Sequence, residues 1–432
     1  MITGNYILKN ALDTTGNAVE VVIESRKIVE TVDTSVQYEV LDCTGLTVLP
    51  GFVDLHTHLR EPGFEQSETV LSGSRSAAAG GYTAIHAMAN TFPVADTAGV
   101  VEQVARLGEE ASLVHVQPIG AVTVGLKGEQ LAELGAMAQS KARVRVFSDD
   151  GSCIHDPSIM RRALEYVKAF DGVIAQHAQE PRLTVGAQMN EGALASRLGL
   201  SGWPAVAEEA IIARDILLTE LTGSRLHVCH VSTSGSVELI RQAKRRGINV
   251  TTEVTPHHLL LTEDLAEGYD PIYKVNPPLR TRKDVEALRM GLVDGTIDVV
   301  ATDHAPHPKE SKDTDWNSAA FGMVGLETAY SITQQVLIDS GESTFSRLAE
   351  VMSINGARIG GLDGQGSYLA SGAPANLTLV DPAQSWVASS KTHSLSENSP
   401  YVGLPMKGRV KYTIFDGEFT YRDGQVMSRE QR

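Results

Sequence analysis

Two histidines and an arginine stand close together in the segment GFVDLHTHLREPG, residues 51–63. An apolar run leads into His56 and His58, and side chains two residues apart on a strand point to the same side. Both imidazoles can therefore reach one metal ion, and imidazole nitrogen is a good ligand for zinc. Arg60 follows two residues later. Its guanidinium would suit a carboxylate, because the planar fork makes two parallel hydrogen bonds.

Similar donor side chains end four later apolar segments. They are Asp149 and Asp150 after VRVFS, His177 after GVIAQ, His230 after RLHVC and Asp303 after DVVAT. A single histidine at such a place is more often structural. Imidazole and carboxylate groups at five segment ends, however, form one N/O ligand set that suits a divalent cation. The sequence therefore predicts a metal centre built from several strands.

The segments that position these donors alternate with longer helical stretches. The strand candidates cover residues 47–56, 82–88, 112–120, 144–148, 172–177, 225–231, 249–254 and 298–302. This alternation predicts parallel strands and, most simply, an α/β fold with a (β/α)8 TIM-like barrel over residues 51–362. The competing fold is an open doubly wound sheet, but no G-x-G-x-x-G follows the first strand to support its nucleotide-binding form. In a barrel the carboxyl ends of the strands meet on one face, where active sites form.

Both ends of the chain have a different pattern, with short β segments between turn residues. Residues 1–50 contain NYILKNA, AVEVVIES and LTVLP, and residues 363–432 contain ANLTLVDP, GRVKYTIFDG and FTYRDGQV. Neither end has enough strands for an independent core. We therefore expect a composite β-sandwich domain formed by residues 1–50 and 363–432 together.

The composition excludes several classes of partner. The 432 residues carry a formal net charge of −16, which argues against nucleic acid and against an anionic membrane surface. No apolar run approaches the roughly 18 residues needed to span a bilayer, and no signal peptide is visible. The three cysteines are far apart and odd in number, which fits a reducing compartment. We therefore expect a cytoplasmic protein whose anionic ligands must find local positive groups.

A series of motifs in a fixed order makes the prediction more specific. They are HTHLREPG, GGYTAIHAMANT, FSDDG, QHAQE, HVCHVST, TPHHL, KVNPPLR and ATDHAPH. In this order they resemble the dihydroorotases, in the long bacterial class I form within the amidohydrolase superfamily of metallo-dependent hydrolases. The resemblance runs from about residue 47 to about residue 382, and the series is far more specific than any single motif.

The resemblance implies a ligand set for two metal ions. In that family the paired histidines after the first strand and the aspartate after the eighth bind one ion, here His56, His58 and Asp303. Histidines after the fifth and sixth strands bind the other, here His177 and His230. Many relatives bridge the ions with a carboxylated lysine, but the fourth strand of this chain ends in FSDDG, without a lysine. An aspartate bridge is implied, and the spacing to His177 favours Asp150. We expect one or two Zn²⁺ ions per chain.

The resemblance also implies a reaction, the reversible cyclisation of N-carbamoyl-L-aspartate to (S)-dihydroorotate and water in de novo pyrimidine (UMP) biosynthesis. Metal ions in such a site lower the pKa of bound water from about 15.7 to near 7 and polarise a carbonyl. Asp303, next to the metal, is the expected proton acceptor and donor. Substrate contacts are expected from Arg60, Asn90, Asn276, His307, Phe321 and Gly322, the first two and His307 on the carboxylate. The polar segment 307–322 is interpreted as a lid, with a passive surface loop as the alternative.

Two alternative functions stay open at this point. One is an allantoinase or dihydropyrimidinase type of cyclic amidohydrolase, which would differ in the carboxylate-binding groups. The other is a non-catalytic dihydroorotase-like scaffold for aspartate transcarbamoylase, although this chain keeps all six metal-type ligands. A homodimer and a complex of an active chain with aspartate transcarbamoylase are both compatible with the resemblance.

Several further histidines and a cysteine are expected to lie outside the ligand set. His227 and Cys229 flank the alternation that ends at His230, so both should face away from the site, and no base is in view to activate the thiol. His257 and His258 are adjacent and would point in opposite directions, which favours structural roles. His304 is expected either to orient Asp303 or to be a ligand.

Overall fold

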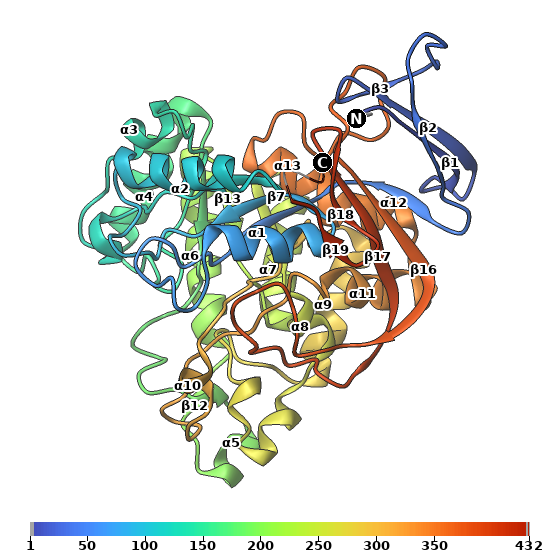
Figure 1. Cartoon of the computed structure of the whole chain (residues 1–432). Helices are drawn as coiled ribbons and strands as arrows, with labels where there is room; N and C mark the ends of the chain where they lie inside the picture. The colour runs from blue at the N-terminus through green and yellow to red at the C-terminus, as the bar shows by residue number, and fades with distance from the viewer. Residues whose placement is uncertain (1–3, 429–430, 432) are drawn as a thin grey trace.

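Parallel strands alternate with helices through the middle of the chain, as the sequence predicts. The structure is a computed structural model that describes residues 4–428 and 431 (Figure 1). The strands are β6 (Phe52–Thr57), β7 (Tyr82–Ala87), β8 (His115–Pro118), β9 (Val146–Phe147), β10 (Val173–Gln176), β13 (Leu226–Val228), β14 (Val250–Val254) and β15 (Val299–Val300). They pair in two parallel ladders, one in the order β6-β7-β8 and the other in the order β15-β14-β13-β10-β9.

Isolated bridges and one buried carboxylate connect the two ladders. Gly120 pairs with Phe147, which joins the end of β8 to β9, and Thr57 pairs with His304, which joins β6 to the segment after β15. The Asp54 carboxylate on β6 accepts hydrogen bonds from the Thr302 hydroxyl at 2.6 Å and from the Thr302 backbone N–H at 3.1 Å. The first and last strands therefore lie side by side, and their carboxyl ends face the same side of the molecule.

The first predicted strand is wrong in one respect, because residues 47–56 form two strands. β5 (Thr47–Pro50) belongs to the sheet of the chain ends, and β6 begins at Phe52. The break occurs at Gly51, where an added Cβ would lie 2.2 Å from the Thr83 hydroxyl oxygen. Only glycine allows this close approach between the two parts of the molecule. An apolar run does not reveal such a change of sheet.

Helices cover the outside of the strands. The longer ones are α1 (Val70–Ala79), α2 (Ala98–Ala111), α4 (Pro157–Val167), α6 (Val206–Thr222), α7 (Ser234–Arg245) and α9 (Arg282–Asp294). The shorter ones are α3 (Leu134–Gln139), α5 (Ala193–Leu198), α8 (Pro256–Leu260), α10 (Lys309–Lys312), α11 (Ala329–Gln334), α12 (Phe345–Ala349) and α13 (Asn355–Gly360), and a small ladder joins β11 (Met189–Asn190) to β12 (Gly202–Trp203). Side-chain caps start several helices; Thr69 begins α1 and Thr281 begins α9, each in a reciprocal capping box.

Both chain ends contribute strands to one sheet. It contains β1 (Tyr6–Leu12), β2 (Ala18–Glu24), β3 (Lys27–Val29), β4 (Glu39–Asp42), β5, β16 (Leu377–Val387), β17 (Pro405–Phe415), β18 (Glu418–Arg422) and β19 (Gln425–Val426). β5 from the first end pairs antiparallel with β16 from the other. Backbone hydrogen bonds link these nine strands into one continuous sheet. The strand pairing alone therefore does not divide the sheet into the two layers of a sandwich.

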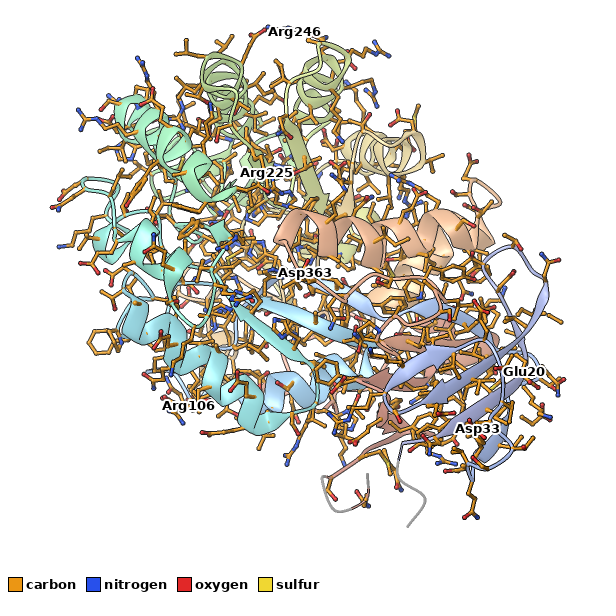
Figure 2. All side chains as sticks on the ribbon, turned by 90° about the horizontal axis from the view of Figure 1, so that it is seen from above. Glu20, Asp33, Arg106, Arg225, Arg246 and Asp363 are labelled. Carbon is orange, nitrogen blue, oxygen red and sulfur yellow. The ribbon has the colours of Figure 1, made fainter. Side chains whose placement is uncertain are left out.

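The charged surface and the amino ends of the strands are visible from above (Figure 2). Arg106 on α2 and Arg246 at the end of α7 lie at the outer edge, whereas Arg225 and Asp363 lie nearer the middle. Arg225 directly precedes β13, so this view shows the face opposite to the strand ends that carry the predicted ligands. Within residues 4–428, no helix has both the length and the apolar character needed to cross a bilayer.

Candidate metal centre

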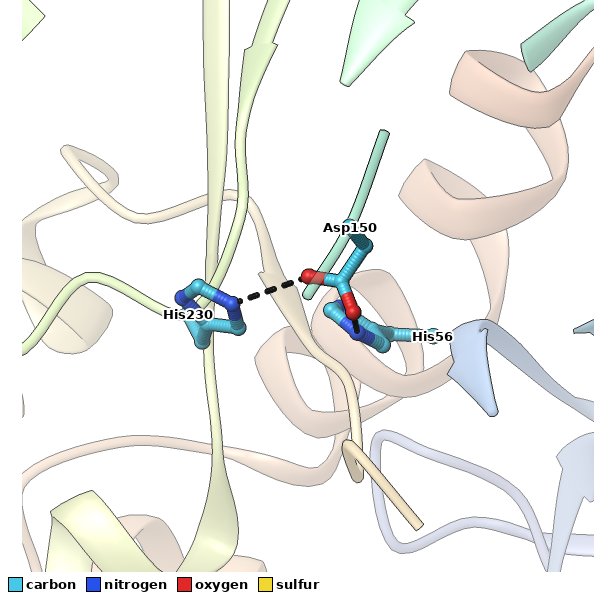
Figure 3. A group of neighbouring side chains, drawn as sticks. All are labelled: His56, Asp150 and His230. Atoms are coloured by element: carbon cyan, nitrogen blue, oxygen red, sulfur yellow. Dashed lines mark hydrogen bonds and ion pairs between the residues drawn. The ribbon is translucent and has the colours of Figure 1, made fainter. Parts of the chain in front are cut away.

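The six predicted metal ligands converge at the carboxyl ends of five strands. His56 Nε2 and His58 Nε2 lie 3.4 and 3.0 Å from Asp303 Oδ1. His56, Asp150 and His230 form a second close group (Figure 3), and all six side chains are buried. Residues separated by up to 247 positions in the chain therefore meet because the strand ladders bring their ends together. Imidazole and carboxylate groups in this arrangement are a suitable donor set for zinc or a similar divalent ion.

Asp150 lies between two groups of histidines. Its Oδ2 atom is 3.4 Å from the Nε2 atoms of both His56 and His58. Its Oδ1 atom faces the other way, 3.3 Å from His177 Nδ1 and 3.2 Å from His230 Nε2. One carboxylate thus presents one oxygen to each pair of imidazoles. This is the arrangement that a bridging ligand requires.

Asp149, the other candidate in FSDDG, has a different role. Its Oδ1 atom accepts hydrogen bonds from the backbone N–H groups of Val122 at 2.8 Å and Thr123 at 3.0 Å. Its Oδ2 atom accepts a short hydrogen bond from the Thr123 hydroxyl. These contacts tie the loop after β8 to the end of β9 and leave Asp150 as the carboxylate that faces the histidines.

A glutamate that the sequence interpretation missed orients His56. Glu253 on β14 lies with Oε1 2.6 Å from His56 Nδ1, and Oε2 lies 3.0 Å from His227 Nε2. A carboxylate behind a metal-binding imidazole fixes the ring and raises its basicity. With Nδ1 donating to Glu253, Nε2 of His56 is directed at the cluster, and it is a buried nitrogen without a hydrogen-bond partner in the described chain. The signal available in the sequence was a carboxylate near the end of the seventh predicted strand.

Two amides hold His58 and His177. Asn90 presents Oδ1 2.9 Å from His58 Nδ1, so Asn90 accepts a hydrogen bond from this ring. Gln179 presents Oε1 2.7 Å from His177 Nε2, and the same oxygen accepts from Asn276 Nδ2 at 3.2 Å. The predicted residues Asn90 and Asn276 are therefore near the ligands, and Gln179 of QHAQE is a further polar group that the sequence interpretation missed.

The electrostatics of the cluster favour positive charge. Burial alone would lower the pKa of His56, but the negative charges of three surrounding carboxylates outweigh it and raise that pKa well above its usual range. Burial alone would raise the pKa of Asp303, but His56 and His58 hold it below its usual range. The carboxylate is therefore ionised at neutral pH. Ionised carboxylates buried around these imidazoles leave an excess of negative charge, which a bound divalent cation would neutralise.

The arginine that opened the sequence interpretation lies at the edge of this centre. Arg60 has a left-handed backbone conformation, with φ of 63°, and its Nε donates to the Pro306 carbonyl at 3.2 Å. Burial lowers its pKa to about 10, so the guanidinium is charged at neutral pH. Within the described residues Arg60 forms no ion pair with a carboxylate of the protein. No carboxylate of the described residues neutralises the guanidinium, whose Nη2 atom lies 3.5 Å from His307 Nε2.

His307 and the Phe321–Gly322 backbone lie next to Arg60. His307 Nε2 is 3.5 Å from Arg60 Nη2 and donates to the Phe321 carbonyl at 2.8 Å. Burial and the nearby Arg60 charge lower the His307 pKa to about 3, so the ring is neutral. Gly322 has φ of 142°, and an added Cβ would lie 2.9 Å from His307 Nε2. The predicted substrate-side residues are thus in contact with one another.

The segment 308–320 is more firmly packed than its polar composition suggests. Lys312 on α10 and Trp316 are buried, and Lys312 Nζ donates to the carbonyls of Pro271 at 3.0 Å and Lys274 at 2.9 Å. Lys274 Nζ donates to the Trp316 carbonyl at 2.7 Å and lies 4.4 Å from the centre of the Phe321 ring. Two lysines therefore fasten the segment from inside, although side chains such as Lys309, Glu310 and Asp313 are exposed. Its role as a lid stays a prediction.

Comparison with known proteins identifies the family. The family described as dihydro-orotase-like matches residues 45–236. The chain is 67% identical over 389 residues to a dihydroorotase of Leifsonia xyli, which covers 90% of this chain and 89% of that protein. It is 62% identical over 403 residues to a dihydroorotase of Streptomyces coelicolor, with 92% and 94% covered.

The chain belongs to the dihydroorotase family. It is therefore an enzyme of the cyclic-amide hydrolase type. Solved structures support the same fold. An L-hydantoinase (dihydropyrimidinase) from Arthrobacter aurescens has a TM-score of 0.86 at 26% identity, covering 99% of this chain and 98% of that one. A dihydropyrimidinase from Brevibacillus agri has a TM-score of 0.82 at 22% identity, covering 98% and 96%. The fold is thus the α/β fold of these hydrolases.

One expectation for this dihydroorotase-family chain is wrong. Cys229 does not face away from the site, because its thiol lies inside, close to His56 and Glu253. β13 ends at Val228 and His230 has φ of 29°, so the alternation of side chains that the prediction used stops before Cys229. Burial raises the pKa of the Cys229 thiol, which therefore stays protonated and is no nucleophile.

The other discounted histidines lie around the centre without joining the six ligands. His227 contacts it only through Glu253. His258 accepts from the Thr255 hydroxyl at 2.8 Å and donates to the Pro277 carbonyl at 3.1 Å. His304 lies 3.2 Å from Glu68 Oε2 and accepts from the Gly325 N–H at 3.3 Å. These contacts give His304 a structural place directly after Asp303.

Proposed function

We propose that the chain catalyses the reversible cyclisation of N-carbamoyl-L-aspartate to (S)-dihydroorotate and water, a step of de novo pyrimidine biosynthesis. The observation that carries this proposal is the place of Arg60, a charged guanidinium without a carboxylate partner in the described chain, beside the six proposed metal ligands. The metal centre suits amide chemistry, and the guanidinium suits a substrate that carries a carboxylate. The names of the close relatives agree with this combination.

The proposed ligands form two sets that share Asp150. His56, His58 and Asp303 would hold one ion, and His177 and His230 would hold the other, with one or two Zn²⁺ per chain. The two oxygens of Asp150 face these sets separately, and His56 Nε2 is a buried orphan nitrogen that a cation would satisfy. When bound, such ions lower the pKa of water and polarise the carbonyl under attack. The chain's own residues bind the substrate and move the protons.

Asp303 is the proposed general acid and base. Its carboxylate is buried and ionised, and its Oδ1 atom lies 3.4 Å from His56 Nε2 and 3.0 Å from His58 Nε2. In ring closure it would remove a proton from the carbamoyl nitrogen of N-carbamoyl-L-aspartate. In ring opening it would return a proton to the departing ring nitrogen. The left-handed φ of 45° at Asp303 turns the carboxylate toward the histidines after β15 has ended.

The remaining predicted residues would bind the substrate. Arg60, Asn90 and His307 are proposed to recognise the carboxylate, with the single N–H of His307 turning from the Phe321 carbonyl to the bound anion. Asn276 is proposed to recognise the pyrimidine ring, because its Oδ1 is buried without a hydrogen-bond partner in the described chain and can accept from a ring N–H. Backbone groups of Phe321 and Gly322 would complete the contact from the segment that covers the site.

A substrate comparison tests the function. Purified protein is assayed with dihydroorotate, hydantoin and allantoin, before and after removal of metal with a chelator and restoration with zinc. We expect metal-dependent hydrolysis of dihydroorotate that exceeds the other two by at least about 10², because only dihydroorotate satisfies the charged Arg60. Activity on hydantoin or allantoin alone would overturn the proposal. Absence of any metal-dependent activity would favour the scaffold.

The arrangement of the whole chain is proposed as follows. Residues 51–362 form a closed (β/α)8 barrel, supported by the bridges at Thr57–His304 and Gly120–Phe147. Residues 1–50 and 363–432 form the composite β domain, supported by the pairing of β5 with β16.

The cytoplasm is the proposed compartment, because all three cysteines are free. A homodimer and a complex with aspartate transcarbamoylase stay predictions, which size measurements with and without that enzyme would test.

A further inference from the structure

A segment from the composite β domain reaches the metal centre, although the proposed mechanism gives it no role. We call residues 393–398, with the sequence HSLSEN, the strap. It lies in the connection between β16 and β17, which leaves the sheet and returns to it in Figure 1. The strap contacts the chain around the proposed substrate site at two places, Glu68 and the backbone of residues 305–307 and 322.

The first place is Glu68, a carboxylate that is fully buried just before α1. Glu68 Oε1 accepts from the Leu395 N–H at 3.1 Å, and Oε2 accepts a short hydrogen bond from the Ser394 hydroxyl. The same Oε2 lies 3.2 Å from His304 Nε2. One buried carboxylate therefore joins the strap to the residue that directly follows Asp303. The strap is consequently fixed in its position along the barrel end.

The second place is Asn398, whose side chain is 4% exposed. Its Nδ2 donates to the Ala305 carbonyl at 2.9 Å and to the Gly322 carbonyl at 3.2 Å. Its Oδ1 accepts from the His307 backbone N–H at 3.1 Å. A single amide thus uses its donors and its acceptor to join residues 305–307 to residue 322. Only the amides of Asn and Gln carry an NH2 donor and a carbonyl acceptor on the same carbon atom.

The joined stretches carry the groups proposed to read the substrate carboxylate. The Pro306 carbonyl, between the two residues that Asn398 holds, accepts from Arg60 Nε at 3.2 Å. The His307 ring donates to the Phe321 carbonyl, which directly precedes the Gly322 carbonyl held by Asn398. A shift of this backbone would therefore move the support of Arg60 and the His307 ring together. Errors of about 1 Å in such groups are costly to binding and catalysis.

We propose that Asn398 is a positioning residue for recognition of the substrate carboxylate, and that the strap is the element through which the composite β domain completes the active site. The proposal rests on the proposed function, because it assumes that Arg60 and His307 bind the carboxylate. Asn398 itself touches neither the metal ligands nor, on this assignment, the substrate. It acts through the backbone of residues 305–307 and Gly322.

Two variants and a matched control test the proposal. Asn398→Ala removes the donors and the acceptor, whereas the isosteric Asn398→Asp keeps an acceptor for the His307 N–H and loses the donors to Ala305 and Gly322. Asn376→Ala is the control, since Asn376 is an equally buried asparagine of the same domain. Asn376 donates to the Gly364 carbonyl at 2.8 Å and accepts from the Asp416 N–H at 2.8 Å, far from the metal centre.

The readouts are KM and kcat for dihydroorotate, direct binding of orotate as an unreactive pyrimidine carboxylate, bound zinc and thermal stability. For Asn398→Ala and Asn398→Asp we expect KM and the orotate dissociation constant to rise about tenfold or more, with kcat changed less than about threefold and zinc retained. Asn376→Ala should lose comparable stability with unchanged KM. If Asn398→Ala does not fold, the same measurements on Asn398→Asp decide the question.

The outcomes separate the two proposals. Stability loss without a change in KM or orotate binding, as in the Asn376 control, would overturn the positioning role of Asn398. An equal fall in kcat and loss of zinc would also overturn it, because the strap would then support the metal centre and not the carboxylate site. Failure of the unmodified protein to act on dihydroorotate would instead refute the proposed function, and the role of Asn398 with it.

Discussion

The metal centre and the substrate-side edge of the site are built by different means. The six proposed ligands lie at or just after the ends of β6, β9, β10, β13 and β15, so strand ladders set their positions. The substrate side depends on single side chains that hold irregular backbone, namely Lys274, Lys312 and Asn398. Ladders repeat over several residues and tolerate the loss of one contact. A loop held by three side chains does not, and we expect it to be the more easily disturbed part.

The largest effect is expected at the ligand shared by both halves of the metal centre. Asp150→Asn removes the carboxylate that faces both histidine pairs, so kcat should fall about 10³-fold or more and bound zinc should fall with it. Steady-state kinetics and metal analysis measure both. Asp149→Asn is the control, because Asp149 contacts backbone and not the histidines. Retained zinc and activity in Asp150→Asn would refute the bridging role.

A smaller and different effect is expected at Arg60 on the substrate side. Arg60→Gln removes the charge that faces the carboxylate, so kcat/KM for dihydroorotate should fall about 10²-fold while zinc content stays unchanged. Arg106→Gln on the exposed surface of α2 is the control and should have no effect. If zinc were lost from Arg60→Gln, the two regions would not be independent, and the comparison above would be wrong.

Glu253 tests how far the support of the metal centre extends. Glu253→Gln keeps the shape of the side chain but removes the charge behind His56, so zinc affinity should fall about 10- to 100-fold. Titration with a competing chelator measures this affinity. KM for dihydroorotate at saturating zinc should stay within about twofold of the unmodified value. A change in KM without a change in zinc affinity would place Glu253 on the substrate side.

The smallest effect is expected from pH on the segment 308–320. Burial lowers the pKa of Lys312 to about 7 when the segment is packed, whereas an exposed lysine titrates near 10.5. Packing therefore releases a proton between these values, so the packed form gains stability as pH rises from about 7 toward 10.5 and shows no such dependence below 7. The open population should change by at most about tenfold per pH unit in that window.

Fluorescence of the buried Trp316 and hydrogen exchange of residues 309–320 follow this opening. Lys312→Met keeps the apolar stem and removes the titrating group, so its opening should be independent of pH between 7 and 9. An equal pH dependence in Lys312→Met and in the unmodified protein would exclude Lys312 as the cause. Zinc content should not differ between them, because the segment belongs to the substrate side.

The sequence by itself determined the strand–helix alternation and the six residues that meet in the metal centre. Both are local signals: apolar periodicity fixes the elements, and donor residues at the ends of parallel strands must share one face. The divided first strand at Gly51, the inward Cys229 and the support by Glu253 were decided by the tertiary structure. So were the buried lysines of segment 308–320 and the strap that Asn398 fastens. These depend on contacts between residues far apart in the chain and on backbone that has left regular structure, where no periodicity predicts which way a side chain points.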